Sequence, residues 1–347
     1  MDRIDFRSDT VSWPTPAMRA AMAQARVGDD VYGEDPTVNE LEALAAAKTG
    51  MEAGLFVASG TMGNLTAILT HAQRGEAAIV GQDAHTFAHE AGGMAALGGI
   101  VPHPLPTDEH GRLSLAGIQN ALPPDNPHYA PRSLILVENS YGAKGGYPLP
   151  PDYFAAIRQI ADAHNLKVHM DGARLFNAAV ALNLDASELT QHVDSVTFCL
   201  SKGLCAPVGS VLCGPAEFIN RARRTRKLLG GGMRQAGILA AAGLVALNEM
   251  IERLDDDHRH ARQLAAGLAA IPGITLDYEV QTNMVFFSLS DDLPIAPDAF
   301  LDTLRATANI WLGSMGGRRF RAVTHYWIGE EEVALFIETV EIVIGYQ

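Results

Sequence analysis

Two segments of the sequence each end a run of apolar residues with side chains that could do chemistry. In HMDGAR, Asp171 and Arg174 follow one such run, and in SVTFCLSKG, Lys202 follows the next. Open α/β sheets bind their ligands at the carboxyl ends of their strands. Lysine is rarely buried without a partner or a function. We therefore expect these side chains to share a site, although a lone Asp after a strand is more often a helix N-cap.

A third segment, LFVASGTMGN, places Gly60 and Thr61 between a predicted strand and a predicted helix. Free backbone N–H groups at the helix start and the Thr61 hydroxyl can bind a phosphate. A phosphate site, an aspartate that can face a pyridine nitrogen and a lysine that can form an imine are what pyridoxal phosphate requires. The order of the three segments thus predicts a pyridoxal-phosphate site.

The elements that must position these residues are short apolar runs alternating with helical segments. The runs do not alternate between polar and apolar residues, which is typical of parallel strands covered by helices on both faces. We therefore predict an α/β fold with strands near 55–59, 76–80, 98–101, 133–139, 166–171, 195–201 and 209–214. The spacing of Thr37 and Glu40, with Gly50 after the last apolar position, predicts a capping box and a helix over 37–50.

The sequence also indicates two domains. A polar stretch at 255–262 follows a long helical segment, so we place the boundary near residue 250. Residues 1–250 are predicted to form the large α/β domain that binds the cofactor. Residues 251–347, with strand-like runs and a helix predicted over 297–308, are predicted to form a small α+β domain.

Composition excludes several classes of protein. The 347 residues carry a net charge of −14, and the basic run at 221–227 is expected to form a solvated or intersubunit helix face, so no nucleic-acid partner is expected. The apolar run at 236–247 is well short of the roughly 20 residues that span a bilayer. Charges occupy the N-terminal segment where a secretory signal would be apolar, which predicts a cytoplasmic protein. Cys199, Cys205 and Cys213 match no zinc spacing and are expected to be buried free thiols.

Over nearly its whole length the chain resembles the threonine aldolase family of fold-type I, aspartate aminotransferase-like pyridoxal-phosphate enzymes. The resemblance is carried by FRSDTVSWPTPAM at 6–18, VGDDVYGEDPTVNELE at 27–42, SGTMGN at 59–64, HTFAHEAGG at 85–93, HMDGARLFNA at 169–178, LSKGLCAPVGS at 200–210 and LLGGGMRQAGILAAAG at 228–243. It implies retro-aldol cleavage of L-threonine, L-allo-threonine or related β-hydroxy-α-amino acids, such as phenylserine, to glycine and an aldehyde.

The resemblance assigns cofactor roles. Lys202 is similar to the lysine that binds pyridoxal phosphate, and Asp171 to the partner of its pyridinium nitrogen. Gly60, Thr61 and the backbone of Met62 match the phosphate-binding turn.

The resemblance also assigns substrate roles. His85 matches the histidine that stacks on the cofactor ring and acts in the aldol step, and His128 a second histidine near the substrate β-hydroxyl. Ser8, Arg174 and Arg321 match the groups that hold the substrate carboxylate, with Arg174 also beside the cofactor.

A further match implies a homo-oligomer, a dimer or tetramer with shared sites, because Arg234 matches an arginine that reaches the phosphate of the neighbouring subunit. Tyr32 could line that neighbour's site or could be a packed aromatic in its loop. The chain departs from the family pattern at 140–142, where Ser-Tyr-Gly replaces the Thr-His-Asn found in many members.

Alternatives remain open from the sequence. A racemase or a β-eliminating lyase could use the same scaffold. His85, His89 and Glu90 could instead ligate a metal in a hydrolase, although no metal is our prediction.

Overall fold

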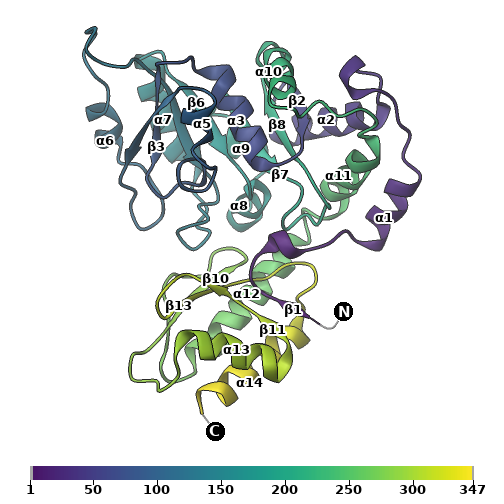
Figure 1. The fold of residues 1–347 in the computed structure, drawn as a ribbon, viewed down its shortest axis with the longest axis vertical. Helices are drawn as coiled ribbons and strands as arrows, with labels where there is room; N and C mark the ends of the chain where they lie inside the picture. Colours follow the sequence, from purple (N-terminus) through teal and green to yellow (C-terminus); the bar gives the residue numbers. More distant parts are fainter. Residues whose placement is uncertain (1–2, 346–347) are drawn as a thin grey trace.

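Seven strands form the central sheet of the larger part of the molecule, in the spatial order β2-β8-β7-β6-β5-β3-β4 (Figure 1). The computed structural model describes residues 3–345. The strands are β2 (Ala53–Val57), β3 (Ala77–Gly81), β4 (Val101–Leu105), β5 (Arg132–Glu138), β6 (Lys167–Asp171), β7 (Ser195–Cys199) and β8 (Ser210–Gly214). Six of the seven predicted strands are confirmed. The seventh is shifted, because β4 begins at Val101, the last residue of the predicted run at 98–101.

One strand differs in direction from the prediction. β8 is antiparallel to both β2 and β7, whereas the other neighbouring strands are parallel. Only residues 200–209 connect β7 to β8. A crossover to a parallel strand needs a dozen or more residues, so this short loop forces a hairpin. Lys202 lies in this loop.

Helices cover both faces of the sheet. One face packs with α2 (Pro36–Thr49), α7 (Pro151–Ala163), α8 (Leu175–Leu182) and α11 (Gly237–Glu249), and the other with α3 (Gly60–His71) and α10 (Ala216–Leu228). The remaining helices of this part are α1 (Pro16–Ala23), α4 (His85–Ala88), α5 (Gly93–Ala96), α6 (Leu115–Asn120) and α9 (Ala186–Thr190). Among the helices of the described chain, none combines the length and apolar character of a bilayer span.

The predicted helix start at Thr37 is corrected by the structure. α2 begins at Pro36, and its N-cap is Asp35, which accepts hydrogen bonds from the N–H groups of Thr37 and Val38. The Thr37 hydroxyl instead donates to the Arg26 carbonyl at 2.6 Å. Gly50, with a φ of 64°, ends the helix as predicted.

The second part has its own core. It contains α12 (Leu254–Ala269), α13 (Pro297–Ala308), α14 (Glu330–Ile344) and an antiparallel sheet ordered β12-β13-β10-β9. These strands are β9 (Ile274–Leu276), β10 (Met284–Leu289), β12 (Gly313–Ser314) and β13 (Arg319–Val323).

The N-terminal segment packs on this second core, whereas the sequence predicts it in the large domain. β1 (Ile4–Asp5) pairs in parallel with β11 (Ile310–Trp311), and Phe6 stacks on Phe336 with ring centroids 4.8 Å apart. A two-residue strand has no periodicity that a sequence pattern could reveal. The chain then crosses to the larger part, as Figure 1 shows, and passes between the two parts on its way.

Candidate active site

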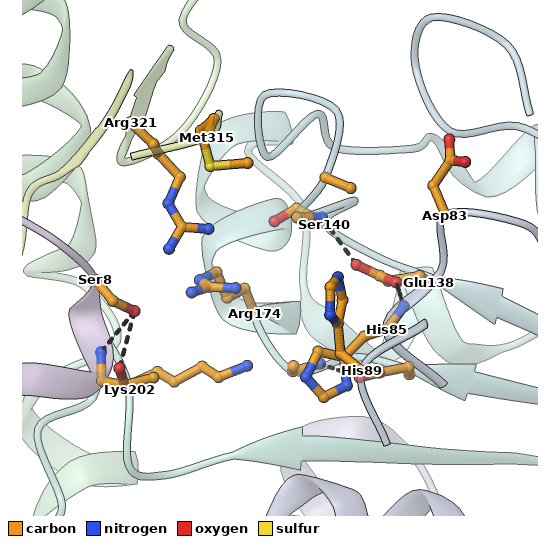
Figure 2. A pocket seen from close by; sticks show the side chains of 15 residues that line it. Ser8, Asp83, His85, His89, Glu138, Ser140, Arg174, Lys202, Met315 and Arg321 are labelled. Carbon is orange, nitrogen blue, oxygen red and sulfur yellow. Dashed lines mark hydrogen bonds between the residues drawn. The ribbon is translucent and has the colours of Figure 1, made fainter. Parts of the chain in front are cut away.

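A cavity of about 320 Å³ opens at the carboxyl ends of β5 and β6 (Figure 2). It is lined by residues of both parts of the molecule: Ser8, Thr10, Asp83, His85, His89, Glu138, Ser140, Gly142, Ala143, Asp171, Ala173, Arg174, Lys202, Met315 and Arg321. β5 and β6 are in register, with Glu138 opposite Asp171 at their ends. Asp171, Arg174 and Lys202, the residues predicted at the strand ends, therefore line one cavity, as expected.

Lys202 enters this cavity from the β7–β8 loop. Its backbone carbonyl accepts hydrogen bonds from the Ser12 hydroxyl at 3.0 Å and from the Cys205 N–H at 2.9 Å. These contacts fix the loop, and the side chain extends across the cavity toward the histidines (Figure 2). Within residues 3–345 its ammonium group makes no hydrogen bond or salt bridge, so the amine is available to a ligand.

Asp171 is a buried carboxylate, 2% exposed, held by neutral donors. It accepts hydrogen bonds from the side-chain amide of Asn64 at 2.9 Å and from the Ala173 N–H at 3.0 Å. The next helix, α8, is not capped by a side chain and starts from Arg174. The helix-cap alternative for Asp171 is thus wrong. Its carboxylate can accept a hydrogen bond from a protonated ring nitrogen.

The predicted phosphate turn forms the start of α3, although its residues do not line the cavity itself. The Ser59 hydroxyl accepts from the Met62 N–H at 3.1 Å, while the N–H groups of Gly60 and Thr61 have no partner in the described chain. A Cβ on Gly60 would lie 2.9 Å from Cys199 Sγ, so glycine lets the helix start lie against β7. Two free N–H groups at a helix start suit a phosphate.

His85 is the first residue of α4 and is held at two points. Its N–H donates to Glu138 Oε2 at 2.8 Å, and its Nδ1 is 2.9 Å from Glu90 Oε1. The hydrogen bond with Glu90 raises the pKa of His85 above its ordinary value. Burial raises the pKa of Glu138 to about 7.

Two arginines approach each other from the two parts of the molecule (Figure 2). Arg174 is paired with the fully buried Asp9 through hydrogen bonds of 2.7 and 2.6 Å. Arg321, on β13, donates to the Arg7 carbonyl at 3.1 Å and has no acidic partner within salt-bridge distance in the described chain. One carboxylate thus faces two cations, an arrangement that favours an anionic ligand.

Comparison with known proteins identifies the family. The model for β-eliminating lyases matches residues 5–291. The low-specificity L-threonine aldolase of Escherichia coli (strain K12) is 43% identical over 331 residues, which is 95% of this chain and 96% of that protein. The probable low-specificity L-threonine aldolase 2 of Arabidopsis thaliana is 42% identical over 342 residues, 97% of this chain and 96% of that protein. The chain belongs to the threonine aldolase family.

A solved structure of Leishmania major threonine aldolase shares the fold. It has a TM-score of 0.83 at 22% identity and covers 98% of this chain and 99% of its own. The predicted family, its α/β fold and the class of pyridoxal-phosphate-dependent lyases are confirmed.

Three residues predicted from the threonine aldolase pattern lie outside the cavity of their own chain. Arg234 pairs with Asp29 at 3.0 Å, and its guanidinium is 6.0 Å from the ring of Tyr32, which is 73% exposed. His128 lies in an exposed loop that precedes β5. This loop is at the amino end of the strand, whereas Glu138 and the cavity are at its carboxyl end.

Of the three residues at 140–142, two line the cavity and one packs in the core. Tyr141 points into the core, where its ring fills the space beside Gly111. Ser140 and Gly142 line the cavity, and the Gly142 N–H donates to Glu138 Oε1 at 2.9 Å.

Two supporting residues were missed by the sequence analysis. Asp9 and Asn64 lie inside the segments FRSDT and SGTMGN that carry the family resemblance. Their place inside these family motifs was the one signal in the sequence that could have identified them.

The proposed metal alternative takes a different form in the structure. His85, Glu90 and Asp171 have ligand atoms within 4.8 Å of one another, whereas His89 is not in the group. The Asn64 amide nitrogen bridges the two carboxylates at 2.8 and 2.9 Å. This donor occupies lone pairs that a cation would need, so the geometry favours a hydrogen-bonded network.

Proposed function

We propose that this protein cleaves L-threonine, L-allo-threonine and related β-hydroxy-α-amino acids, such as phenylserine, to glycine and an aldehyde. The observation that carries the proposal is one cavity shared by a free lysine amine, a buried carboxylate and two arginines. The relatives named low-specificity L-threonine aldolases support the choice of substrate.

The residues present fit pyridoxal phosphate. Lys202 would bind its aldehyde carbon, Asp171 would accept a hydrogen bond from its ring nitrogen, and Gly60, Thr61 and Met62 would hold its phosphate. When bound, the cofactor supplies an electron-withdrawing ring that accepts the electrons of a bond broken at the substrate α-carbon.

Arg174 and Arg321 would bind the substrate carboxylate, with the Ser8 hydroxyl beside them. Asp9 fixes Arg174 through its Nε and one Nη, which leaves the other Nη for the substrate. A carboxylate fixed at one end and an amine fixed at the other orient the remaining α-carbon substituents. We therefore expect cleavage of L isomers only.

His85 is our candidate for the base that takes the β-hydroxyl proton. Glu90 accepts a hydrogen bond at Nδ1, so the neutral ring carries its proton there and keeps a free lone pair at Nε2. The same hydrogen bond raises the pKa of His85, which makes its free nitrogen a stronger base for proton abstraction.

Arg234 and Tyr32 support a homo-oligomer, a dimer or tetramer. Because their side chains do not line the cavity of their own chain, a role in the reaction would place them in the site of another subunit. The proposed role of His128 near the β-hydroxyl likewise requires the site of another subunit.

We also propose that the enzyme is cytoplasmic.

Product analysis tests this function. Protein loaded with pyridoxal phosphate is incubated with the four threonine stereoisomers and with phenylserine, and Lys202→Ala serves as the control. We expect glycine and an aldehyde in equal amounts. An inverted amino acid would indicate a racemase instead, and a keto acid with ammonia a β-eliminating lyase.

A further inference from the structure

A chain of hydrogen-bonded side chains runs through the protein interior behind Asp171. Asn64, on α3, connects Asp171 to His169 of β6, which in turn contacts Ser195 of β7. The chain ends at His71, the last residue of α3. Asn64, His169 and Ser195 are at most 1% exposed, so water does not compete for these contacts. None of these four residues lines the cavity.

The direction of every hydrogen bond in this chain follows from Asn64. Its Nδ2 lies 2.8 Å from Glu90 Oε1 and 2.9 Å from Asp171 Oδ2, and both oxygens are acceptors. The amide nitrogen must therefore face the carboxylates, and Oδ1 must face His169 Nε2 at 3.1 Å. Because Oδ1 only accepts, His169 carries its proton on Nε2.

The rest of the chain is then determined. Burial lowers the pKa of His169 to about 3, so its ring is neutral and Nδ1 is an acceptor. The Ser195 hydroxyl therefore donates to Nδ1 at 2.8 Å. The same hydroxyl oxygen accepts from His71 Nε2 at 2.7 Å, which leaves each buried group of the chain satisfied.

We propose that His169 is a positioning residue for catalysis that fixes Asp171 and Glu90 through Asn64. The Asn64 amide contacts both carboxylates, one expected to face the cofactor nitrogen and the other orienting His85. The donor of His169 supplies the third point that stops this amide from rotating. The inference rests on the proposed role of Asp171 toward pyridoxal phosphate.

Cofactor affinity in a double-mutant cycle tests the proposal. The dissociation constant of pyridoxal phosphate is measured by titration of the apoprotein for wild type, His169→Phe, Asp171→Ala and the double variant. We expect His169→Phe to weaken binding at least tenfold in the wild-type background and less than twofold in the Asp171→Ala background. A purely structural role would weaken binding equally in both backgrounds.

Two variants serve as controls. His169→Gln keeps an amide donor for Asn64 and should restore affinity to within about threefold of wild type. His258→Phe removes another buried histidine, whose Nε2 is 3.2 Å from Asn177, outside the chain, and should leave affinity unchanged. Equal losses in His258→Phe and His169→Phe would overturn the proposal, as would full additivity in the cycle.

The protonation state provides a measurement on the wild-type protein, which does not depend on variants that fold poorly. Nitrogen NMR of histidine-labelled protein should show one ring, absent from the spectrum of His169→Gln, that stays neutral with its proton on Nε2 from pH 6 to 8. A proton on Nδ1, or a charged ring, would overturn the assignment. Product analysis with L-threonine tests the proposed function independently of this NMR measurement. Failure of the His169 assignment can therefore be distinguished from failure of the proposed function.

Discussion

The Asp9–Arg174 pair makes a quantitative prediction for Asp9→Asn. Asp9 is 0% exposed and the Arg174 side chain 10% exposed, and two short hydrogen bonds connect them. Burial alone would raise the pKa of Asp9, but Arg174 outweighs burial and holds it well below the usual range. The pair is therefore ionised and shielded from solvent, and asparagine removes its negative charge with almost no change in shape.

The loss of unfolding free energy can be worked out from the Arg174 charge, which stays buried in the variant. Removing one partner of a buried ion pair costs about 3–5 kcal/mol, because the other charge stays buried. The asparagine carbonyl can still accept one hydrogen bond from Arg174, so we expect the lower end, about 3 kcal/mol. The larger part of the molecule has about 250 residues, and for domains of about 150–250 residues each kcal/mol corresponds to roughly 2–4 °C. The Tm of this part should therefore fall by about 6–12 °C. KM for L-threonine should rise at least tenfold, because Arg174 loses its fixed orientation.

Thermal unfolding and steady-state kinetics measure both effects, and Asp5→Asn is the matched control. Asp5 is also buried, but its partners Arg3 and Arg7, at 3.2 and 2.7 Å, are 45% and 37% exposed, so water can solvate the cations that are left. We expect a loss below about 1 kcal/mol and an unchanged KM for this control. Equal losses of Tm in the two variants, or an unchanged KM in Asp9→Asn, would refute the reasoning.

Four further predictions concern the other groups of the site. Lys202→Ala should lose the visible absorption of lysine-bound cofactor and nearly all turnover; a retained band would contradict the assignment. The hydrogen bond with Glu90 raises the pKa of His85, so Glu90→Gln should lower it and move the acidic limb of the kcat/KM pH profile to lower pH; an unmoved limb would remove Glu90 from this role. Inactive Arg234→Ala chains mixed with inactive Lys202→Ala chains should regain activity if Arg234 serves a neighbour, and no recovery in verified hetero-oligomers would exclude that. Arg321→Met should raise KM at least tenfold without lowering Tm, because it removes a partly buried cation that has no acidic partner; a large loss of Tm would show that Arg321 is mainly structural.

Much of the fold could be predicted from the sequence because the signals are local. The central strands are continuous apolar runs, and the helix over 297–308 has the bounds that its pattern predicted. The direction of β8 depends on the length of the loop before it, and the pairing of β1 depends on a strand some three hundred residues away. Local periodicity contains neither piece of information.

The same distinction applies to the site. Lys202 and Asp171 could be predicted because each follows an apolar run at a strand end. Asp9 and Asn64 act through partners 165 and 107 residues away, so their residue types alone gave no reason to single them out. Arg321 came only from the family resemblance, because its neighbours Arg318 and Arg319 are the same residue type.

The distribution of charge supports a substrate site in the cavity between the two parts of the molecule. Asp9 neutralises Arg174, whereas Arg321, beside the same cavity, has no acidic partner within salt-bridge distance in the described chain. Burial and the neighbouring Arg174 both lower the pKa of Arg321, which means that its charged form is disfavoured without an anion. A carboxylate that contacts Arg321 would remove this penalty, and in the proposed binding mode the same carboxylate also contacts Arg174 of the larger part. Binding at the carboxylate end would then depend on the relative position of the two parts, which would also set where the α-carbon lies relative to Lys202 and His85.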